Sequence, residues 1–168
     1  MALSMYHASV PVFRRALTNL STILDKGAAY AAPRKIDFSV LLNMRLAPDM
    51  FPLVRQVQSA SDNAKGPAAR LAGIDPPKFA DTETTHEELK ARIARTLDFL
   101  ASIQPAQIDG SEQRQITLQL GTGPVNFTGQ DYLLNFALPN FFFHVTTAYD
   151  ILRHAGVEIG KRDFLGAR

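Results

Sequence analysis

Four long stretches of the chain carry apolar residues at intervals of three and four, the spacing that lets a helix bury one face. The first stretch predicts a helix over residues 3–28 that ends near Gly27. Pro11 lies inside this stretch and lacks the N–H that a helix interior needs, so we expect a kink near His7.

The second long helix is expected at residues 48–72, after a short helix over 38–46 that Asp37 caps. Pro48 suits a first helical turn, where a missing N–H does no harm. The pair Gly66-Pro67 falls within this helix, and we expect it to bend the helix or end it early.

Thr84, followed three residues later by Glu87, predicts a capping box at the start of a third helix over residues 85–103. We expect His86, in its first turn, to be exposed to solvent. The face opposite the apolar stripe is expected to be solvated and consists of Lys90, Arg92 and Arg95. Pro105 is expected to stop the helix.

Residues 116–127 change to the alternating pattern of a β-hairpin, with a turn at Gly121-Thr122-Gly123. Together these elements predict an all-α fold, an up-down-type four-helix bundle with a small β-hairpin between helices 3 and 4. A chain of 168 residues, 46% hydrophobic and 20% charged, suits a single domain over residues 1–168.

The fourth helix is the longest apolar stretch, and Thr128 with Asp131 three residues later predicts its start. We expect Pro139 to kink this helix near its middle and Gly156 to end it. The tail GKRDFLGAR is expected to form an irregular cap.

The 18 basic and 16 acidic residues alternate along the chain, so we expect no basic stripe for nucleic acid. The absence of cysteine excludes disulfides and thiolate chemistry and fits a cytoplasmic protein. The N-terminus has no signal-peptide pattern, and the most apolar run is too interrupted to span a membrane.

Phe141, Phe142 and Phe143 cover most of the circumference of the fourth helix, since successive residues are about 100° apart. Such a helix either lies at the centre of the bundle or also faces a second subunit. A homodimer would bury the surplus apolar surface.

Asn140 and His144 are four residues apart and share a helix face, the spacing of a two-ligand metal arm. The alternative for His144 is a hydrogen-bonded histidine in a polar pocket. Gln56 and Asn63 share a face of the second helix, where they either line that pocket or bond to helix ends and water. The further pocket candidates are His7 and Tyr149, the latter with ordinary core packing as its alternative.

Three segments carry a resemblance: SMYHASVPVFRRALTNL, LAPDMFPLVRQVQSASDNAKG and FTGQDYLLNFALPNFFFHVTTAYDILRHAGVEIGKRDFLG. They resemble a family of uncharacterised bacterial proteins known only as a domain of unknown function. That family is placed in the DinB/YfiT-like superfamily of four-helix bundles. The resemblance covers nearly the whole chain, and its most specific part is residues 140–166.

The resemblance also implies where a metal site would lie. Many members of the superfamily bind a divalent metal through three histidines, one from the second helix and two, four residues apart, from the last. Some are thiol transferases or hydrolases that use bacillithiol or mycothiol. By resemblance His144 matches the third ligand, Asn140 the second, and Gln56 lies nearest to the first. This implies a degenerate site for zinc, nickel or manganese.

Three functions are compatible with the sequence. The first is a non-catalytic or small-ligand-binding protein with a degenerate pocket and no cofactor. The second is a metal-dependent enzyme of thiol transfer or hydrolysis that uses His144. The third is a dimeric assembly module without pocket chemistry.

Overall fold

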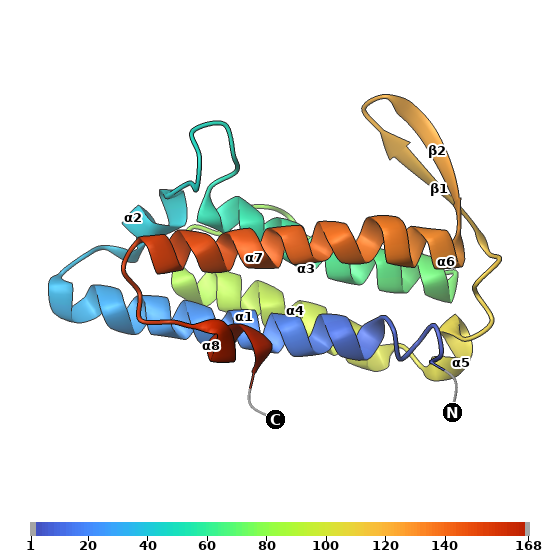
Figure 1. Ribbon diagram of the computed structural model, residues 1–168, viewed down its shortest axis with the longest axis horizontal. Coiled ribbons are helices and arrows are strands. Elements are labelled where there is room, and N and C mark those ends of the chain that lie inside the picture. Colours follow the sequence, from blue (N-terminus) through green and yellow to red (C-terminus); the bar gives the residue numbers. More distant parts are fainter. Residues whose placement is uncertain (1–2, 167–168) are drawn as a thin grey trace.

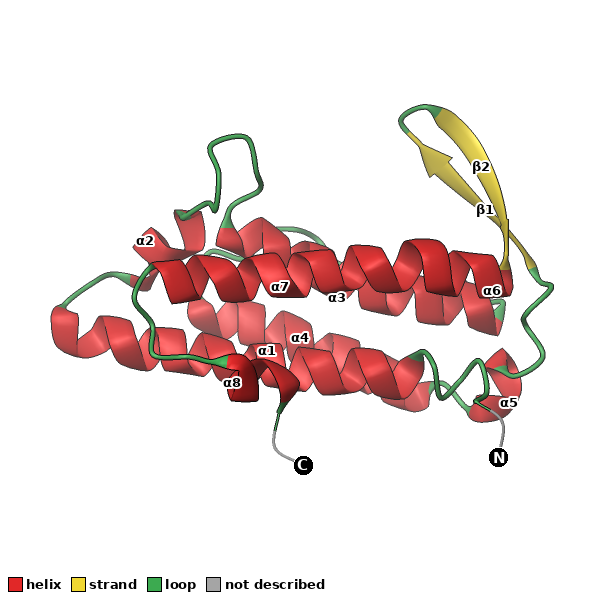
Figure 2. Ribbon diagram, viewed as in Figure 1, coloured by secondary structure: helices red, strands yellow, loops and turns green. Residues whose placement is uncertain are grey.

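The computed structural model describes residues 3–166, in which four long helices lie side by side as a bundle (Figures 1 and 2). They are α1 (Val10–Ala31), α3 (Leu53–Ala72), α4 (His86–Ser102) and α7 (Leu138–His154). Helix α3 packs against both α4 and α7, and α1 also packs against both of them. The predicted four-helix bundle is therefore confirmed.

Within residues 3–166, six shorter helical segments connect or extend the bundle. They are η1 (Ala32–Arg34), α2 (Phe38–Asn43), α5 (Pro105–Ile108), α6 (Gly129–Asp131), the π-helical η2 (Tyr132–Ala137) and α8 (Lys161–Leu165). The predicted cap of α2 is present, because the Asp37 carboxylate accepts the N–H of Ser39 at 2.8 Å. The tail was wrongly predicted to be irregular, since it contains α8, whose Asp163 carboxylate accepts the Gly160 N–H at 2.8 Å.

The predicted β-hairpin is present and projects from one end of the bundle (Figure 1). Its strands are β1 (Gln115–Leu120) and β2 (Gly123–Thr128), which pair antiparallel with Leu120 opposite Gly123. The two residues between them form the turn. Gly123 has a φ of 113°, a value that favours glycine.

Two prolines that interrupt the helical pattern mark helix starts in the structure. Pro11 lies in the first turn of α1, and Pro52 is the N-cap residue of α3. The predicted helix starts at residues 3 and 48, and the kink near His7, were therefore wrong. The physical reason is that first-turn N–H groups have no partner inside a helix, so proline removes nothing there.

Two other local predictions also need correction. Helix α3 continues past Pro67 to Ala72, so the second of the two outcomes expected for Gly66-Pro67, an early helix end, is wrong. The capping box of α4 is one residue later than predicted, because the Thr85 hydroxyl accepts the N–H of Glu88. The Glu88 carboxylate in turn accepts the Thr85 N–H at 3.1 Å. Both residues satisfy N–H groups at the helix end.

The long helix predicted from Thr128 is present as one continuous helical run, made of α6, η2 and α7. The π-helical segment η2 lies directly before the turn that holds Pro139. A proline cannot donate to the preceding turn, and a wider π turn is one way in which a helix adapts to that loss. The Thr128 hydroxyl accepts the Asp131 N–H, as predicted.

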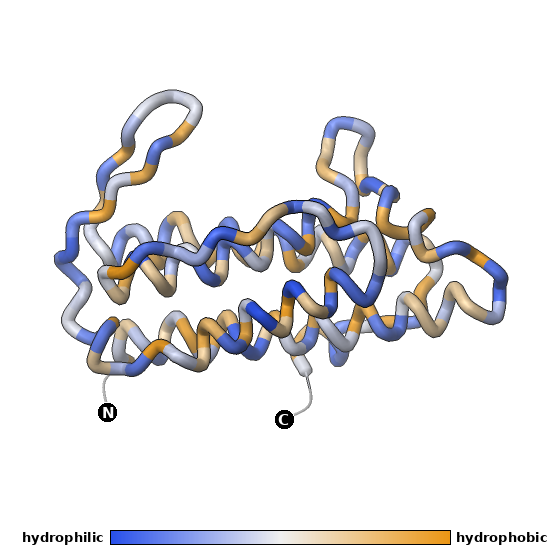
Figure 3. The backbone as a smooth tube through the Cα atoms, turned by 180° about the vertical axis from the view of Figure 1, so that it is seen from behind, coloured by the Kyte–Doolittle hydropathy of each residue, from blue (hydrophilic) through white to orange (hydrophobic). Residues whose placement is uncertain are grey.

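Buried apolar residues from all four long helices form one core, and hydrophobic and hydrophilic positions recur in turn along each of these helices (Figure 3). Phe13 of α1 and Phe141 of α7 are fully buried and touch edge to face, with 5.0 Å between their ring centroids. Within residues 3–166 no helix combines the length and apolarity needed to cross a membrane.

Candidate functional site

His144 and Gln56 meet between α7 and α3, although 88 residues separate them in the sequence. The Nδ1 atom of His144 lies 2.8 Å from the Oε1 atom of Gln56. Helices α3 and α7 are close neighbours along the bundle, and each places one of the two side chains on the shared face. Gln56 is buried, with 1% of its surface exposed, whereas His144 is half-buried.

The hydrogen bonds fix which nitrogen of His144 carries its proton. The Nε2 atom of Gln56 donates to the carbonyl oxygen of Phe51 at 3.0 Å, so the amide oxygen is the atom that faces the imidazole. That oxygen only accepts, and Nδ1 of His144 must therefore donate to it. In a neutral imidazole this leaves Nε2 as an acceptor with a free lone pair.

The surroundings of His144 favour the neutral imidazole. Burial of the ring lowers the pKa of His144, and the positive charge of Arg55 on the adjoining turn of α3 lowers this pKa further. Both effects act against an imidazolium ion. At neutral pH the site therefore presents an uncharged, oriented imidazole.

Three of the other predicted pocket residues make contacts of their own, and Asn140 lies one helical turn from His144. Asn63 donates to the Ser59 carbonyl of its own helix at 2.9 Å. Asn140 is half-buried on α7, one helical turn before His144. His7 is exposed, with its Nδ1 atom 3.0 Å from the Ser4 hydroxyl. Tyr149 packs edge to face on Phe164, with centroids 5.8 Å apart.

His86 is not the exposed residue that its first-turn position predicted. Only 16% of its side chain is exposed, and its Nε2 atom lies 3.0 Å from the Asp25 carboxylate of α1. Its ring also meets the edge of Phe38, with 5.2 Å between centroids. The first turn of α4 faces α1 and α2, which covers a residue that an isolated helix would expose.

A charged cluster around Arg92 was missed by the sequence prediction of a solvated face. Arg92 is 0% exposed, and its Nη2 atom donates to Asp62 of α3 at 2.8 Å. Its Nη1 atom donates to the Ala80 carbonyl and to Glu83, at 3.0 and 3.1 Å. The same atom lies 3.0 Å from an oxygen of Asp81.

The helical spacing contained the signal for this burial. Arg92 follows buried Leu89 by three residues and precedes buried Thr96 by four, so it lies on the inner stripe of α4. A buried arginine is stable only with charged and hydrogen-bonding partners. Ala80, Asp81 and Glu83 lie in the connection between α3 and α4. Their contacts with Arg92 hold this connection against the two helices.

Comparison with known proteins establishes the family. The profile of a domain of unknown function, DUF1993, matches residues 5–165. The chain belongs to the DUF1993 family. A crystal structure of a DinB family member protein from Shewanella denitrificans is similar to this DUF1993 chain, with 46% sequence identity and a TM-score of 0.92. The likeness covers 97% of this chain and 92% of that one. No match to a curated protein was found.

The residues of this DUF1993 chain do not fit a histidine-ligated metal. His144 is the one imidazole that the described residues place at the site, so it could supply a single histidine ligand. The two other ligand positions implied by the sequence hold the amides Gln56 and Asn140, which are weak ligands for zinc or nickel. In the part of the chain that the structure describes, no three His, Asp or Glu residues are grouped to hold a metal ion.

Proposed function

We propose that this DUF1993 protein binds a small molecule non-catalytically at His144. The observation that supports this is the hydrogen-bond series from Phe51 through Gln56 to His144, which orients a neutral imidazole. Its Nε2 lone pair suits a ligand that donates an N–H or O–H group. The half-buried position of the ring allows such a group to reach it.

Metal-dependent thiol transfer or hydrolysis is less well supported by the same residues. An imidazole with Nδ1 bonded to an oxygen resembles a metal ligand held by an outer partner. A catalytic zinc needs about three protein ligands, however, and two of the three positions hold amides. The donor set therefore favours ligand binding over catalysis.

Two measurements test this proposal. Long-range ¹H–¹⁵N spectra of the imidazoles report the tautomer of His144, and we expect Nδ1 protonation near neutral pH. Ligand-observed NMR with a library of small N–H and O–H donors then identifies binders. We expect them to bind the wild type and His7→Gln, an exposed control, and to lose binding in His144→Phe.

Two results would contradict the proposal. One is a set of binders that is insensitive to His144→Phe. The other is a stoichiometric amount of zinc, nickel or manganese in protein purified without a metal-affinity tag, if His144→Ala removes it. That second result would favour the metal-dependent enzyme.

A dimeric assembly module is a second candidate, because α7 and its extension carry large exposed apolar side chains. Phe143 is 55% exposed and Leu134 is 46% exposed. Contact of the Phe143 side chain with a second copy would remove apolar surface from water. Light scattering tests it: we expect a dimer that Phe143→Ser weakens and that Leu3→Ser, another exposed position, leaves intact.

A further inference from the structure

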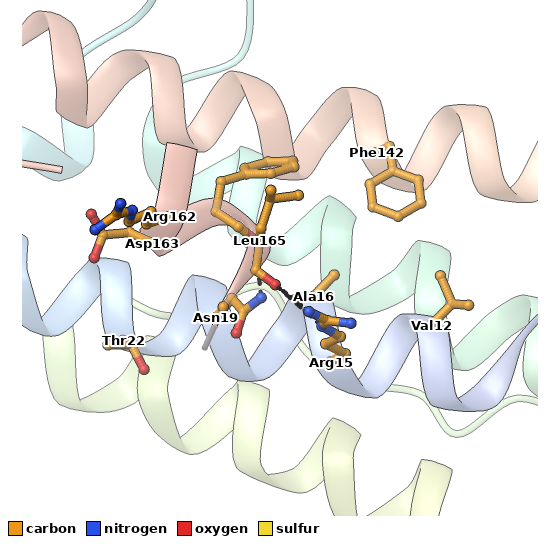
Figure 4. Close-up of a pocket in the computed structure, with 11 residues that line it drawn as sticks. Val12, Arg15, Ala16, Asn19, Thr22, Phe142, Arg162, Asp163 and Leu165 are labelled. Atoms are coloured by element: carbon orange, nitrogen blue, oxygen red, sulfur yellow. Dashed lines mark hydrogen bonds between the residues drawn. The ribbon is translucent and has the colours of Figure 1, made fainter. Parts of the chain in front are cut away.

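A groove of about 1100 Å³ lies between α1, α7 and α8, away from the contact of His144 with α3. One part of it is apolar, and there Val12 of α1 and Phe142 of α7 face each other (Figure 4). Leu165 of α8, which is 50% exposed, lies at its border. This surface is suited to the hydrocarbon part of a ligand. Contact between the two would release water from the groove and from the ligand.

Arg15 gives the groove an oriented positive charge. Its Nε and Nη2 atoms both donate to the Leu165 carbonyl oxygen, at 3.2 and 2.8 Å. These bonds hold the guanidinium plane beside the apolar part of the groove (Figure 4). The Nη1 atom makes no hydrogen bond to any other residue within 3–166, so it retains donors for an anion.

The acidic residue that lines the groove does not neutralise the positive charge of the lining. Asp163 is the acidic residue of the lining, and its carboxylate lies 2.5 Å from the ammonium of Lys26. Arg162 lies at the same end of the groove and forms no ion pair among the described residues. Among residues 3–166, Arg15 and Arg162 are thus two cations of the lining without an ion-pair partner, and the groove favours an anion.

We infer that this groove binds a small amphipathic carboxylate, with its headgroup at Arg15 and its hydrocarbon chain along Val12 and Phe142. The headgroup is expected to carry a single negative charge. Only the Arg15 guanidinium lies next to the apolar surface, and two of its nitrogen atoms already donate to the Leu165 carbonyl. Arg162 is farther along the groove and contributes a weaker, salt-screened attraction.

Octanoate is the probe, and 1-octanol is its neutral match. We expect calorimetry to show octanoate binding to the wild type more tightly than 1-octanol and more tightly than butanoate. Arg15→Gln should weaken octanoate binding by about fivefold or more, because it removes a charge-assisted contact. Arg162→Gln should have a smaller effect that disappears at high salt.

Arg14→Gln is the matched control, since Arg14 is the exposed neighbour of Arg15 on α1 and does not line the groove. It removes the same charge, and octanoate affinity should change by less than about twofold. Because Arg15 also bonds to the Leu165 carbonyl, 1-octanol affinity in Arg15→Gln reports whether the apolar surface has kept its shape. We expect that affinity to remain at the wild-type level.

Several results would overturn the inference. These are no measurable octanoate binding, equal affinities for octanoate and 1-octanol, or equal losses in Arg15→Gln and Arg14→Gln. The inference would also be overturned if Arg15→Gln reduced the affinities for octanoate and 1-octanol equally. The contact between the carboxylate and Arg15 would then not be the source of the affinity. Amide shifts on octanoate addition must also map to α1, α7 and α8, and shifts centred on His144 would count against it.

Discussion

Arg92 of α4 and Asp62 of α3 form an ion pair of 2.8 Å in which the arginine side chain is completely buried. Asp62 is 44% exposed, so the pair runs from the interior to the surface. Lys65 of α3 lies 2.9 Å from the same carboxylate oxygen. The contact between α3 and α4 is therefore partly ionic.

Arg92→Met is expected to lower the free energy of unfolding by about 3–5 kcal/mol, because it removes the buried cation closest to the buried Glu83 carboxylate. Chemical denaturation monitored by circular dichroism measures this change. Arg95→Met is the control, since Arg95 is 55% exposed and lies 3.7 Å from Glu83. It should cost less than about 1 kcal/mol. Equal losses in the two variants would contradict a special role for Arg92.

Acid should destabilise the protein in part through His144. Its pKa is lowered in the folded state, so the unfolded chain binds a proton more readily. The stabilisation from the neutral imidazole is complete above the ordinary histidine pKa of about 6.5 and is lost as the pH falls below it. Thermal melts of His144→Gln should therefore depend less on pH than those of the wild type between about pH 7.5 and 5. His7→Gln should retain the wild-type dependence, and an identical dependence in all three proteins would refute this prediction.

Gly129→Ala is expected to destabilise the protein by about 1–3 kcal/mol through overpacking. A Cβ atom at this position would lie 2.0 Å from the Ser111 carbonyl oxygen, a backbone atom that does not move easily. At Gly160 an added Cβ has no atom within 4 Å, and φ is −143°. Gly160→Ala should therefore change the denaturation midpoint little, and the two midpoints are compared in the same denaturant series.

The positions of Gln56 and Asn140 relative to His144 indicate how a metal site could be created. The double variant Gln56→His and Asn140→His should bind about one equivalent of zinc, because it supplies three imidazoles around one position. Elemental analysis and a zinc-dependent rise in melting temperature measure this gain. The double variant Asn63→His and Asn140→His is the control, since Asn63 bonds to its own helix. Equal zinc binding by both would contradict the placement of the site.

The helical bundle was predictable because its signals are local. The spacing of apolar residues located each long helix, and alternation located the hairpin with its turn between Leu120 and Gly123. Helix boundaries were less accurate, because a proline such as Pro11 is compatible both with a helix start and with an interruption inside a helix. Packing of the preceding residues decides between the two, and spacing alone contains no information about it.

The site was only partly predictable for a different reason. Sequence spacing placed Gln56 and His144 on suitable helix faces, but not at hydrogen-bonding distance from each other. For Arg92 the inner position was readable from Leu89 and Thr96. Its partner Glu83 lies in an irregular connection, and no periodicity predicts where such a segment returns to the bundle.

The Arg92 cluster also has a consequence for local motion. The connection between α3 and α4 has little regular structure, yet its Ala80 carbonyl and Glu83 carboxylate bind a buried guanidinium. If this segment detached alone, it would leave a cation in apolar surroundings without these partners. Its opening is therefore expected to be coupled to separation of α3 from α4, so that an apparently loose surface loop and two helices behave as one cooperative unit.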